Sequence, residues 1–395
     1  MPTKIAIGFS RLNDPVAAFK NAAIQVKQQL NSVTVNVVLV FATDAYMSEE
    51  GLETLHRILQ PERLIGSLTP GILLGNKAEM RGVGILGIMS DDWHFGAAGI
   101  DNLNLITTRE AGYNLAKILV TDHASPNRNA AICFYDGLRK NNSLICAGMN
   151  EGFGLALPVF GGIGLDSDHI RYTRHFYQTR IINDAAVGLL IGGASITAVT
   201  SHQSLKPLGK PRIIDNAKEN IIRTIDKRPA VNLYENYFLE KGQTLDRNKI
   251  NAIRMLYPLG IGTMNAREYL IRNPIDFLED GSIVCQGEIP TGSPVHLMVT
   301  DKDICRRNIH DAAVSLHEQL LGKPPGLVLV LESFMRHKAM GNAETPTVST
   351  IRDVLGSAVP IFGMYTLGEI ASPGSLKNFH ATQLLNASLA LLAIG

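Results

Sequence analysis

The sequence has no long apolar run, no paired cysteines and no excess of charge of either sign. Its longest apolar runs, such as Leu389 to Ile394, fall far short of the roughly 20 residues that a helix needs to cross a bilayer. The chain starts Met1-Pro-Thr-Lys-Ile, without the apolar core of a signal peptide. We therefore expect a cytoplasmic protein without a membrane span.

The charge balance and the cysteines exclude two further classes. The chain has 37 Lys and Arg residues against 36 Asp and Glu residues, whereas nucleic-acid binders usually carry a basic excess. The four cysteines are far apart and form no C-x-x-C pair, so we expect no zinc or iron–sulfur site built from them alone. These residues are Cys133, Cys146, Cys285 and Cys305.

Common catalytic motifs are also missing. The chain contains no G-x-x-x-x-G-K-[ST], H-E-x-x-H or G-x-S-x-G string. A G-x-G-x-x-G string does occur at Gly82 to Gly87, but it lies inside an apolar segment and does not lead into a helix, as a dinucleotide site requires. We therefore expect a protein that is not an enzyme, and an active site assembled from distant residues stays as the alternative.

The length and composition predict two globular domains. A chain of 395 residues is longer than a single hydrophobic core usually supports, and its 45% of hydrophobic residues is a globular proportion. We place the boundary at Arg228-Pro229, which gives domains 1–228 and 229–395. Just before and across this boundary, the pattern from Asp215 to Tyr237 predicts a charged amphipathic helix.

One order of elements recurs three times. Each copy has an apolar strand, a helix, a strand with small residues and a last apolar strand. The first strands of the copies are Val37–Phe41, Ala131–Tyr135 and Leu327–Leu331. In the first copy Ser48 is the expected N-cap of the helix. Fully apolar strands are typical of sheets covered on both faces, so we predict an α/β fold with mixed sheets and covering helices.

The candidate site residues lie at strand ends of these copies. Asp44, Asp136 and Glu332 follow or end the three first strands, where they contact a ligand or cap a loop. His202 and His337 also lie near strand ends, and a single histidine is enough for axial haem ligation.

Two groups of motifs give the chain a family resemblance. Pro207-Leu-Gly209 and Asp226-Lys-Arg-Pro-Ala230 resemble the "P-(I/L)-G" turn and the "(D/E)-x-(R/K)-P-A" string at the end of FIST N domains. Pro360 to Ile370, which ends in Gly-Glu-Ile, is similar to the FIST C string "G-(F/Y)-x-x-x-G-E-I". Asn378-Phe-His-Ala-Thr382 is similar to the FIST C pattern "F-H-N-x-T", with alanine at the asparagine position. Glu332-Ser-Phe-Met-Arg336 stands where the family often has Asp-Cys-x-x-Arg.

The resemblance implies a sensory module that binds small ligands and acts in signal transduction. Its implied partners are a histidine kinase of a two-component system, or a diguanylate cyclase or phosphodiesterase. We expect Arg336 to bind an anionic ligand group, Glu369 to hold a cationic group or brace its loop, and Tyr365 and Glu332 to complete the site. Because some stand-alone family members are haem proteins that sense nitric oxide, the second hypothesis is a haem-based sensor with His202 or His337 as axial ligand.

Overall fold

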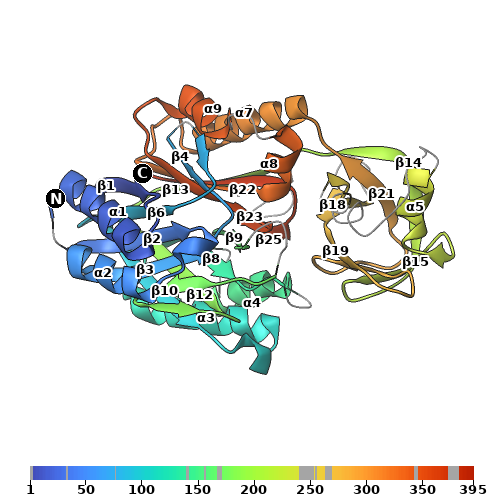
Figure 1. Cartoon of the computed structure of the whole chain (residues 1–395), viewed down its shortest axis with the longest axis horizontal. Helices are drawn as coiled ribbons and strands as arrows, with labels where there is room; N and C mark the ends of the chain where they lie inside the picture. Colours follow the sequence, from blue (N-terminus) through green and yellow to red (C-terminus); the bar gives the residue numbers. More distant parts are fainter. Residues whose placement is uncertain are drawn as a thin grey trace.

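The computed structural model describes residues 3–32, 34–75, 77–138, 142–154, 157–166, 171–239, 253, 256–262, 269–341, 346–371 and 382–395. These residues form a body of three sheets and a smaller lobe with a fourth sheet. Figure 1 shows the lobe standing beside the body, with both chain termini in the body. The predicted α/β class with mixed sheets is confirmed.

The body consists of three copies of one unit, which we call units one, two and three. Each unit runs strand, helix, strand, one or two helices, strand, hairpin, strand. Unit one contains β1 (Lys4–Ser10), α1 (Pro15–Leu30), β2 (Val35–Ala42), α2 (Glu49–Leu59), β3 (Pro61–Leu68), β4 (Ile72–Leu74), β5 (Lys77–Glu79) and β6 (Val83–Met89). Unit two contains β7 (Trp93–Ile100), α3 (Thr108–His123), β8 (Arg128–Tyr135), α4 (Leu144–Phe153), β9 (Val159–Ile163), β10 (His175–Tyr177), β11 (Arg180–Ile182) and β12 (Ala186–Gly193).

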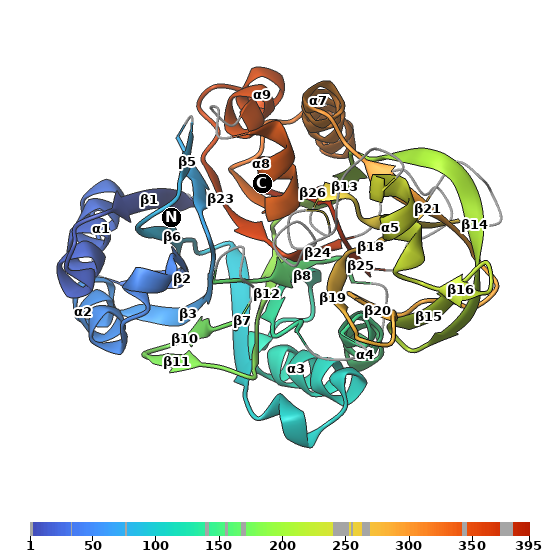
Figure 2. The ribbon, with the colours of Figure 1, turned by 45° about the vertical axis from the view of Figure 1, so that its right-hand side comes forward.

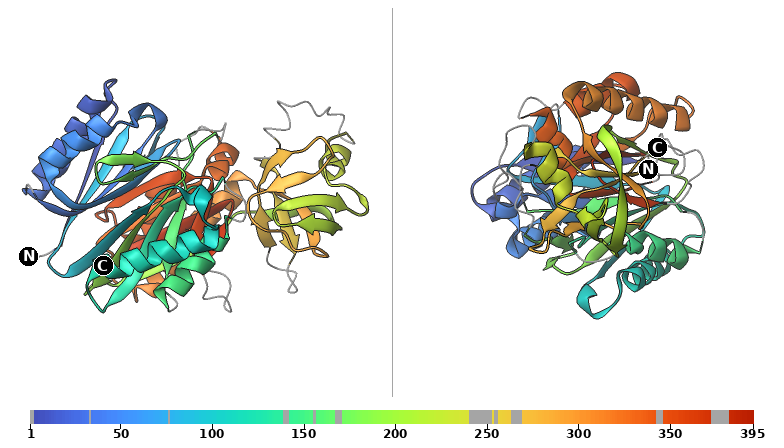
Figure 3. Two further views of the ribbon diagram at one scale, coloured as in Figure 1. Left: turned by 90° about the horizontal axis from the view of Figure 1, so that it is seen from below. Right: turned by 90° about the vertical axis from the view of Figure 1, so that its right-hand side faces the viewer.

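Unit three is interrupted by the lobe. It contains β13 (Thr197–Gln203), α7 (Lys302–Gln319), β22 (Leu327–Ser333), α8 (Phe334–Met340), α9 (Pro346–Leu355), β23 (Ile361–Thr366), β24 (Gly368–Ala371), β25 (Gln383–Leu385) and β26 (Ser388–Ile394). Between β13 and α7 lie the lobe elements β14 (Lys206–Lys218), β15 (Ile221–Ile225), β16 (Arg228–Pro229), α5 (Asn232–Leu239), β17 (Leu259–Gly262), β18 (Tyr269–Arg272), β19 (Pro274–Phe277), β20 (Ile283–Cys285) and β21 (Pro294–Val299). Figure 3 shows how far this insertion stands from the body sheets.

The three units are tied together by a cyclic exchange of hairpins. Strand β4 of unit one pairs with β23 of unit three, β24 of unit three pairs with β9 of unit two, and β10 of unit two pairs with β3 of unit one. Each body sheet therefore contains strands of two units. Figure 2 shows the blue, cyan-to-green and red units arranged around a common centre.

A glycine at one repeated position lets the central strands approach closely. In each unit the two middle strands run parallel, and Gly66, Gly161 and Gly363 occupy matching places in the second of them. A Cβ atom there would lie 2.0, 1.9 and 2.3 Å from a backbone oxygen of the neighbouring strand. Only glycine avoids these contacts. The close approach of the two backbones therefore requires glycine at this position of each unit, in addition to the apolar pattern of the strands.

The core lies where the inner faces of the three sheets meet. Phe41 of β2 stacks on Phe362 of β23 with ring centroids 4.8 Å apart, and it meets Phe134 of β8 edge-on at 5.5 Å. One aromatic ring thus contacts side chains from all three units. The outer faces of the sheets pack against the helices. Helix α2 begins at the predicted cap, because the side chain of Ser48 accepts a hydrogen bond from the backbone nitrogen of Gly51.

The outer edge of β1 is covered by two glutamine side chains of α1. Gln25 accepts a hydrogen bond from the Phe9 nitrogen (3.1 Å) and donates one to the Phe9 oxygen (2.9 Å). Gln29 makes the same two bonds to Ile7, at 3.3 and 2.8 Å. Residues four apart on a helix thus meet residues two apart on a strand, and the side-chain amides replace a neighbouring strand.

The predicted domain boundary at residue 228 lies inside the sheet of the lobe. Arg228 pairs with Ile225 between β16 and β15, and the lobe elements β14 to β21 lie in the chain between β13 and α7. The division at residue 228 stays a prediction. The helix predicted from Asp215 to Tyr237 is wrong, because most of this segment forms β14 to β16 and only α5 is helical. The polar residues that suggested a helix lie on exposed strands.

No helix in the described part of the chain is both long and apolar enough to span a bilayer.

Candidate functional site

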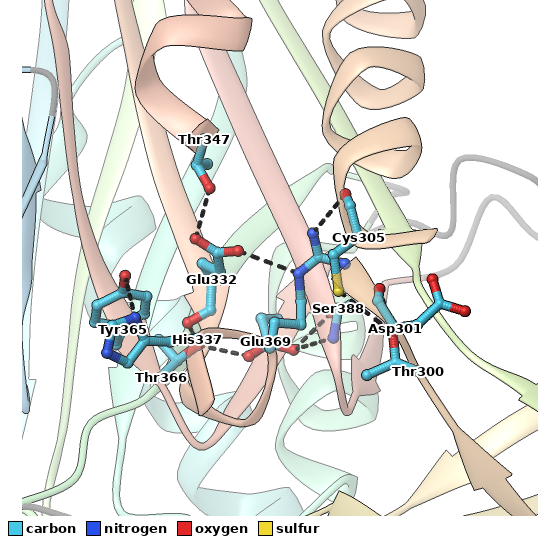
Figure 4. Close-up of polar contacts among 11 residues, drawn as sticks. Thr300, Asp301, Cys305, Glu332, His337, Thr347, Tyr365, Thr366, Glu369 and Ser388 are labelled. Atoms are coloured by element: carbon cyan, nitrogen blue, oxygen red, sulfur yellow. Dashed lines mark hydrogen bonds and ion pairs between the residues drawn. The ribbon is translucent and has the colours of Figure 1, made fainter. Parts of the chain in front are cut away.

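The four predicted ligand residues come together at the end of unit three that faces the lobe. Glu332 lies near the end of β22, Arg336 follows in α8, Tyr365 lies near the end of β23, and Glu369 lies in β24. All four have no measurable exposure to solvent. Figure 4 shows the labelled side chains of this region and their polar contacts. We call these four residues and their hydrogen-bond partners the unit-three cluster.

Arg336 and Glu332 form the charged centre of the cluster. The Arg336 Nε donates to Glu332 Oε1 over 3.3 Å, and Nη2 donates to the Cys305 carbonyl oxygen over 3.3 Å. Thr347 donates to the other carboxylate oxygen of Glu332 at 2.9 Å. Burial raises the pKa of Glu332, and the guanidinium of Arg336 opposes that shift.

One nitrogen of Arg336 has no partner among the described residues. Nη1 is buried and makes no hydrogen bond within the described chain. A buried donor that stays unsatisfied costs roughly 1–3 kcal/mol, and more when it is charged. This atom therefore favours the approach of a hydrogen-bond acceptor, and an anionic acceptor most of all.

Glu369 is held by three donors. Thr366 donates to Oε1 at 2.5 Å, while the Ser388 nitrogen and hydroxyl donate to Oε2 at 3.1 and 2.6 Å. Burial nevertheless raises the pKa of Glu369 to about 7, against the lowering influence of Ser388, Thr366 and Arg336. The carboxyl group therefore changes charge near neutral pH.

Tyr365 and His337 contact each other. The Tyr365 hydroxyl lies 3.0 Å from His337 Nδ1, and the two ring centroids are 4.6 Å apart. Phe334 stacks on the His337 ring at 5.6 Å. The Tyr365 hydroxyl therefore contacts Nδ1 of His337 and not the other ring nitrogen, Nε2.

His202 has one property that axial ligation of a haem iron requires. Its Nε2 is buried and has no hydrogen-bond partner within the described residues. Burial lowers the pKa of His202, with Asp311 opposing the shift and Arg336 adding to it. A neutral imidazole with a free nitrogen is the form that ligates a haem iron.

The lobe supplies residues that sequence reasoning missed. The Asn273 nitrogen donates to Asn386 Oδ1 at 3.0 Å, and the Asn273 amide donates to the Leu367 oxygen at 3.5 Å and to Gln286 Oε1 at 3.4 Å. Asn273 and Gln286 belong to the lobe, whereas Leu367 and Asn386 belong to unit three. No local sequence motif marks these amides, because their contacts join segments about 100 residues apart.

The other two units do not repeat the acidic pair. In the first middle strand of each unit, one residue pairs with the repeated glycine. Two positions after that residue, the chain has Ala42 in unit one, Tyr135 in unit two and Glu332 in unit three. The hairpin position of Glu369 is taken by Ile72 in unit one and by His175 in unit two. The cluster is therefore specific to unit three, the unit that carries the lobe.

Asp44 and Asp136 lie near the matching strand ends of units one and two. Asp44 accepts a hydrogen bond from the Tyr172 hydroxyl at 2.6 Å, and Asp136 accepts one from the Leu138 nitrogen at 3.0 Å. Asp136 thus holds a residue of its own loop, whereas Asp44 of unit one contacts a residue of unit two. The motif residues 378–381 lie outside the described residues.

Comparison with known proteins identifies two family models that together match most of the chain. The model described as the FIST N domain matches residues 36–228, and the model described as the FIST C domain matches residues 230–372. No curated protein sequence matches the chain.

Several solved structures align over the whole chain at very low identity. A cyanuric acid hydrolase from A. caulinodans is 6% identical, with a TM-score of 0.42 over 100% of this chain and 98% of that one. A second cyanuric acid hydrolase structure is 8% identical, with a TM-score of 0.38 over 100% and 99%. Phosphoribosylformylglycinamidine synthase II from Thermotoga maritima is 9% identical, with a TM-score of 0.23 over 100% and 72%. Scores this low carry no argument about fold or function.

Proposed function

Because this chain belongs to the family of proteins with FIST N and FIST C domains, whose members are sensory proteins that bind small ligands, we propose that it senses a small anionic ligand at the unit-three cluster. The observation that carries the proposal is the buried Nη1 of Arg336, which has no hydrogen-bond partner in the part of the chain that the structure describes. A carboxylate would give this nitrogen its missing acceptor. The neighbouring Glu369 would favour binding of the anion when its own carboxyl group is neutral. That form is available near neutral pH because the pKa of Glu369 is raised to about 7.

The signal would be a change in how the lobe sits on the body. The cluster lies at the base of the lobe, where Asn273 contacts both Leu367 and Asn386. A ligand shifts such an equilibrium only if it binds one arrangement more tightly than the other. Contacts of the ligand to both the lobe and the body would provide that difference in affinity. We propose that the ligand binds without chemical turnover.

A ligand screen tests this proposal directly. The protein is mixed with the common amino acids, acetate and succinate, and its unfolding temperature is measured. We expect at least one carboxylate to raise the temperature, and Arg336→Met to abolish the rise. Arg306→Met is the matched control, because the Arg306 side chain is 63% exposed on α7. A wild-type protein that ignores the whole panel, or an Arg336→Met variant that still binds, would refute the proposal.

The partner that we propose is a histidine kinase, or a diguanylate cyclase or phosphodiesterase. The family membership is the support for this step. The purified protein is added to the candidate kinase with and without the carboxylate that binds, and autophosphorylation is followed. A kinase activity that never changes with the sensor or its ligand argues against this partner class.

A haem-based nitric oxide sensor is the second candidate, because the buried Nε2 of His202 has no partner among the residues described. Haem would supply an iron that binds the gas, and His202 would hold that iron from one side. His337 fits less well, since its ring is packed between Phe334 and Tyr365. Haem titration should then give a shifted Soret band that His202→Ala loses, and an unshifted band ends this alternative.

A further inference from the structure

The outer edge of β7 in unit two borders a cavity of about 620 Å³. Strand β7 is the last strand of its sheet, and it lies beside β3 of unit one (Figure 2). Residues from the starts of both strands line the cavity. The buried side chains among them are Trp93 and Phe95, and the exposed acids are Glu62 and Asp91. The volume lies in the range of ligand sites in proteins, and we call this space the β7 cavity.

The register of β7 turns the backbone of Phe95 toward this edge. Because β7 pairs with β12 in antiparallel register, alternate β7 residues direct their N–H and C=O groups away from β12. The Trp93 nitrogen belongs to this outward set, since it donates to Ser90 Oγ at 3.0 Å. The Ala97 nitrogen belongs to it as well, and it donates to Asp122 Oδ2 at 2.8 Å. Phe95 lies midway between them, so its N–H and C=O also point outward, and no other part of the described chain bonds to them.

Unit one closes the corresponding edge, whereas unit two leaves Phe95 open. Strand β1 is likewise the last strand of its sheet, and the side chains of Gln29 and Gln25 bond both backbone groups of Ile7 and Phe9. Proteins generally cover such edges, because an edge residue with a free N–H and C=O pairs with an added strand. The open backbone of Phe95 therefore offers a place for strand addition.

The β7 cavity carries an excess of negative charge. Among the residues that line it, Arg63 is the single lysine or arginine, and its guanidinium already bonds to Asp122 Oδ2 at 2.9 Å and to Glu62 Oε2 at 3.2 Å. Together with Asp91, three carboxylates surround this one guanidinium. A lysine or arginine side chain from a partner would complement this charge.

We propose that the β7 cavity docks an extended, basic segment of a partner protein, which pairs with Phe95 as an added strand. A carbonyl oxygen of the segment accepts from the Phe95 nitrogen, an amide of the segment donates to the Phe95 oxygen, and its cationic side chains lie near Glu62 and Asp91. The paired stretch is short, because Asp122 already occupies the Ala97 nitrogen. The cavity shares no residue with the unit-three cluster, so docking here is independent of the proposed sensor site.

A peptide titration tests the pairing. The full chain is titrated with an acetylated and amidated pentapeptide of alternating lysine and valine, and the fluorescence of Trp93, the single tryptophan of the chain, is followed. We expect a saturable change. The same peptide with N-methyl groups on its backbone amides should bind at least about tenfold more weakly, because it cannot donate to the Phe95 oxygen. Equal binding of the two peptides, or no fluorescence change with either, would refute the proposal.

Amide exchange shows where the peptide lies. The lysine peptide should slow the exchange of the Phe95 amide at least about tenfold, because that amide becomes hydrogen-bonded. The Ile7 amide is the control, since Gln29 already covers it, and its exchange should not change. A fluorescence change without slower exchange at Phe95 would place the peptide elsewhere and overturn the proposal. Protection of Phe95 on concentrating the protein alone would make the occupant a second copy of this chain, and would overturn it too.

A charge variant tests the basic character of the segment. Glu62→Gln/Asp91→Asn should bind the lysine peptide about fivefold more weakly than the wild type, as for the loss of two exposed ion pairs. Glu53→Gln/Asp303→Asn is the matched control, because it removes two exposed carboxylates far along the chain from the cavity residues and should bind like the wild type. A peptide with glutamate in place of lysine should bind the wild type more weakly than the lysine peptide does. Equal affinity for the two peptides, or equal affinities of the two variants for the lysine peptide, would refute a basic partner segment.

Discussion

Arg336 donates a hydrogen bond to Glu332 across 3.3 Å, and the two side chains are 1% and 0% exposed. Their four-residue spacing arises because α8 starts directly after β22, so that one turn of helix folds the guanidinium back onto the strand end. A charged pair with so little exposure is costly to build and more costly to break.

Removing one member of this pair should destabilise the protein more than replacing both. Arg336→Met leaves the Glu332 carboxyl buried without its cation, and we expect a loss of about 3–5 kcal/mol in the free energy of unfolding. The double variant Glu332→Gln/Arg336→Met removes both charges of this pair and should recover at least half of that loss. Urea unfolding at pH 7 measures both. Equal losses in the two variants would show that the pair is not coupled.

Glu369 should make stability depend on pH between about 4.5 and 7. Its pKa is raised by burial to about 7, so the folded protein binds this proton more tightly than the unfolded chain does. The contribution to stability is therefore complete below pH 4.5 and is lost as the pH rises through 7. Glu369→Gln removes this dependence and should be more stable than the wild type at pH 8, by a difference on the order of 2–3 kcal/mol.

Unfolding midpoints measured across this pH range check the slope. Asp276→Asn in the exposed part of the lobe serves as the carboxylate control and should leave the slope unchanged. A Glu369→Gln variant whose stability falls with pH as steeply as that of the wild type would contradict the prediction.

Ligand binding should take up a proton near neutral pH. An anion beside Arg336 disfavours the ionised form of Glu369, whose charge already interacts with that arginine. Acetate should thus bind several-fold more tightly at pH 6 than at pH 8. Calorimetry in two buffers of different ionisation heat reports the proton uptake, and Glu369→Gln should abolish it. An affinity that is the same at both pH values would exclude this coupling.

Phe41 should stabilise all three units at once. Its ring contacts Phe362 and Phe134, which belong to the other two units. Phe41→Ala opens a cavity at their junction and should cost about 3–5 kcal/mol in a single unfolding transition. Tyr113→Ala is the control, because Tyr113 is 41% exposed and should cost far less. Separate transitions for the units would contradict this shared core.

The two glutamines of α1 should keep β1 from pairing with another chain. Gln25→Ala/Gln29→Ala frees the backbone groups of Phe9 and Ile7 that these side chains now cover. An uncovered edge strand is a template for a second strand, so we expect the double variant to self-associate. Light scattering after size exclusion measures this. Gln28→Ala, exposed on the same helix, should behave like the wild type, and a double variant that matches it would refute the role.

Much of the fold could be predicted from local pattern. The strands Val37–Phe41, Ala131–Tyr135 and Leu327–Leu331 are apolar because both of their faces are covered, and each lies within a central strand of the body. The threefold recurrence of strands and helices could be recognised in the sequence for the same reason, because the covered central strand of each unit is apolar. The segment from Asp215 to Tyr237 was misassigned, since exposed strands of a small sheet carry charges at spacings that also fit a helix.

The site was only half visible in the sequence. Arg336, Glu332, Tyr365 and Glu369 follow strand ends in one stretch of chain, so local reasoning could group them. Gln286 and Asn386 carry no such signal, because an amide becomes informative only when its surroundings fail to satisfy it.

The sequence by itself determined which segments form the repeated strands and that acids follow three of them, because burial and strand ends leave a local imprint. Only the tertiary structure decided which unit exchanges its hairpin with which, and that the lobe grows out of unit three. It also decided that Arg336 is buried, with one nitrogen that finds no acceptor within the described part of the chain. These features depend on contacts between residues distant in the chain, and such contacts are set by the packing of whole sheets rather than by neighbouring residues.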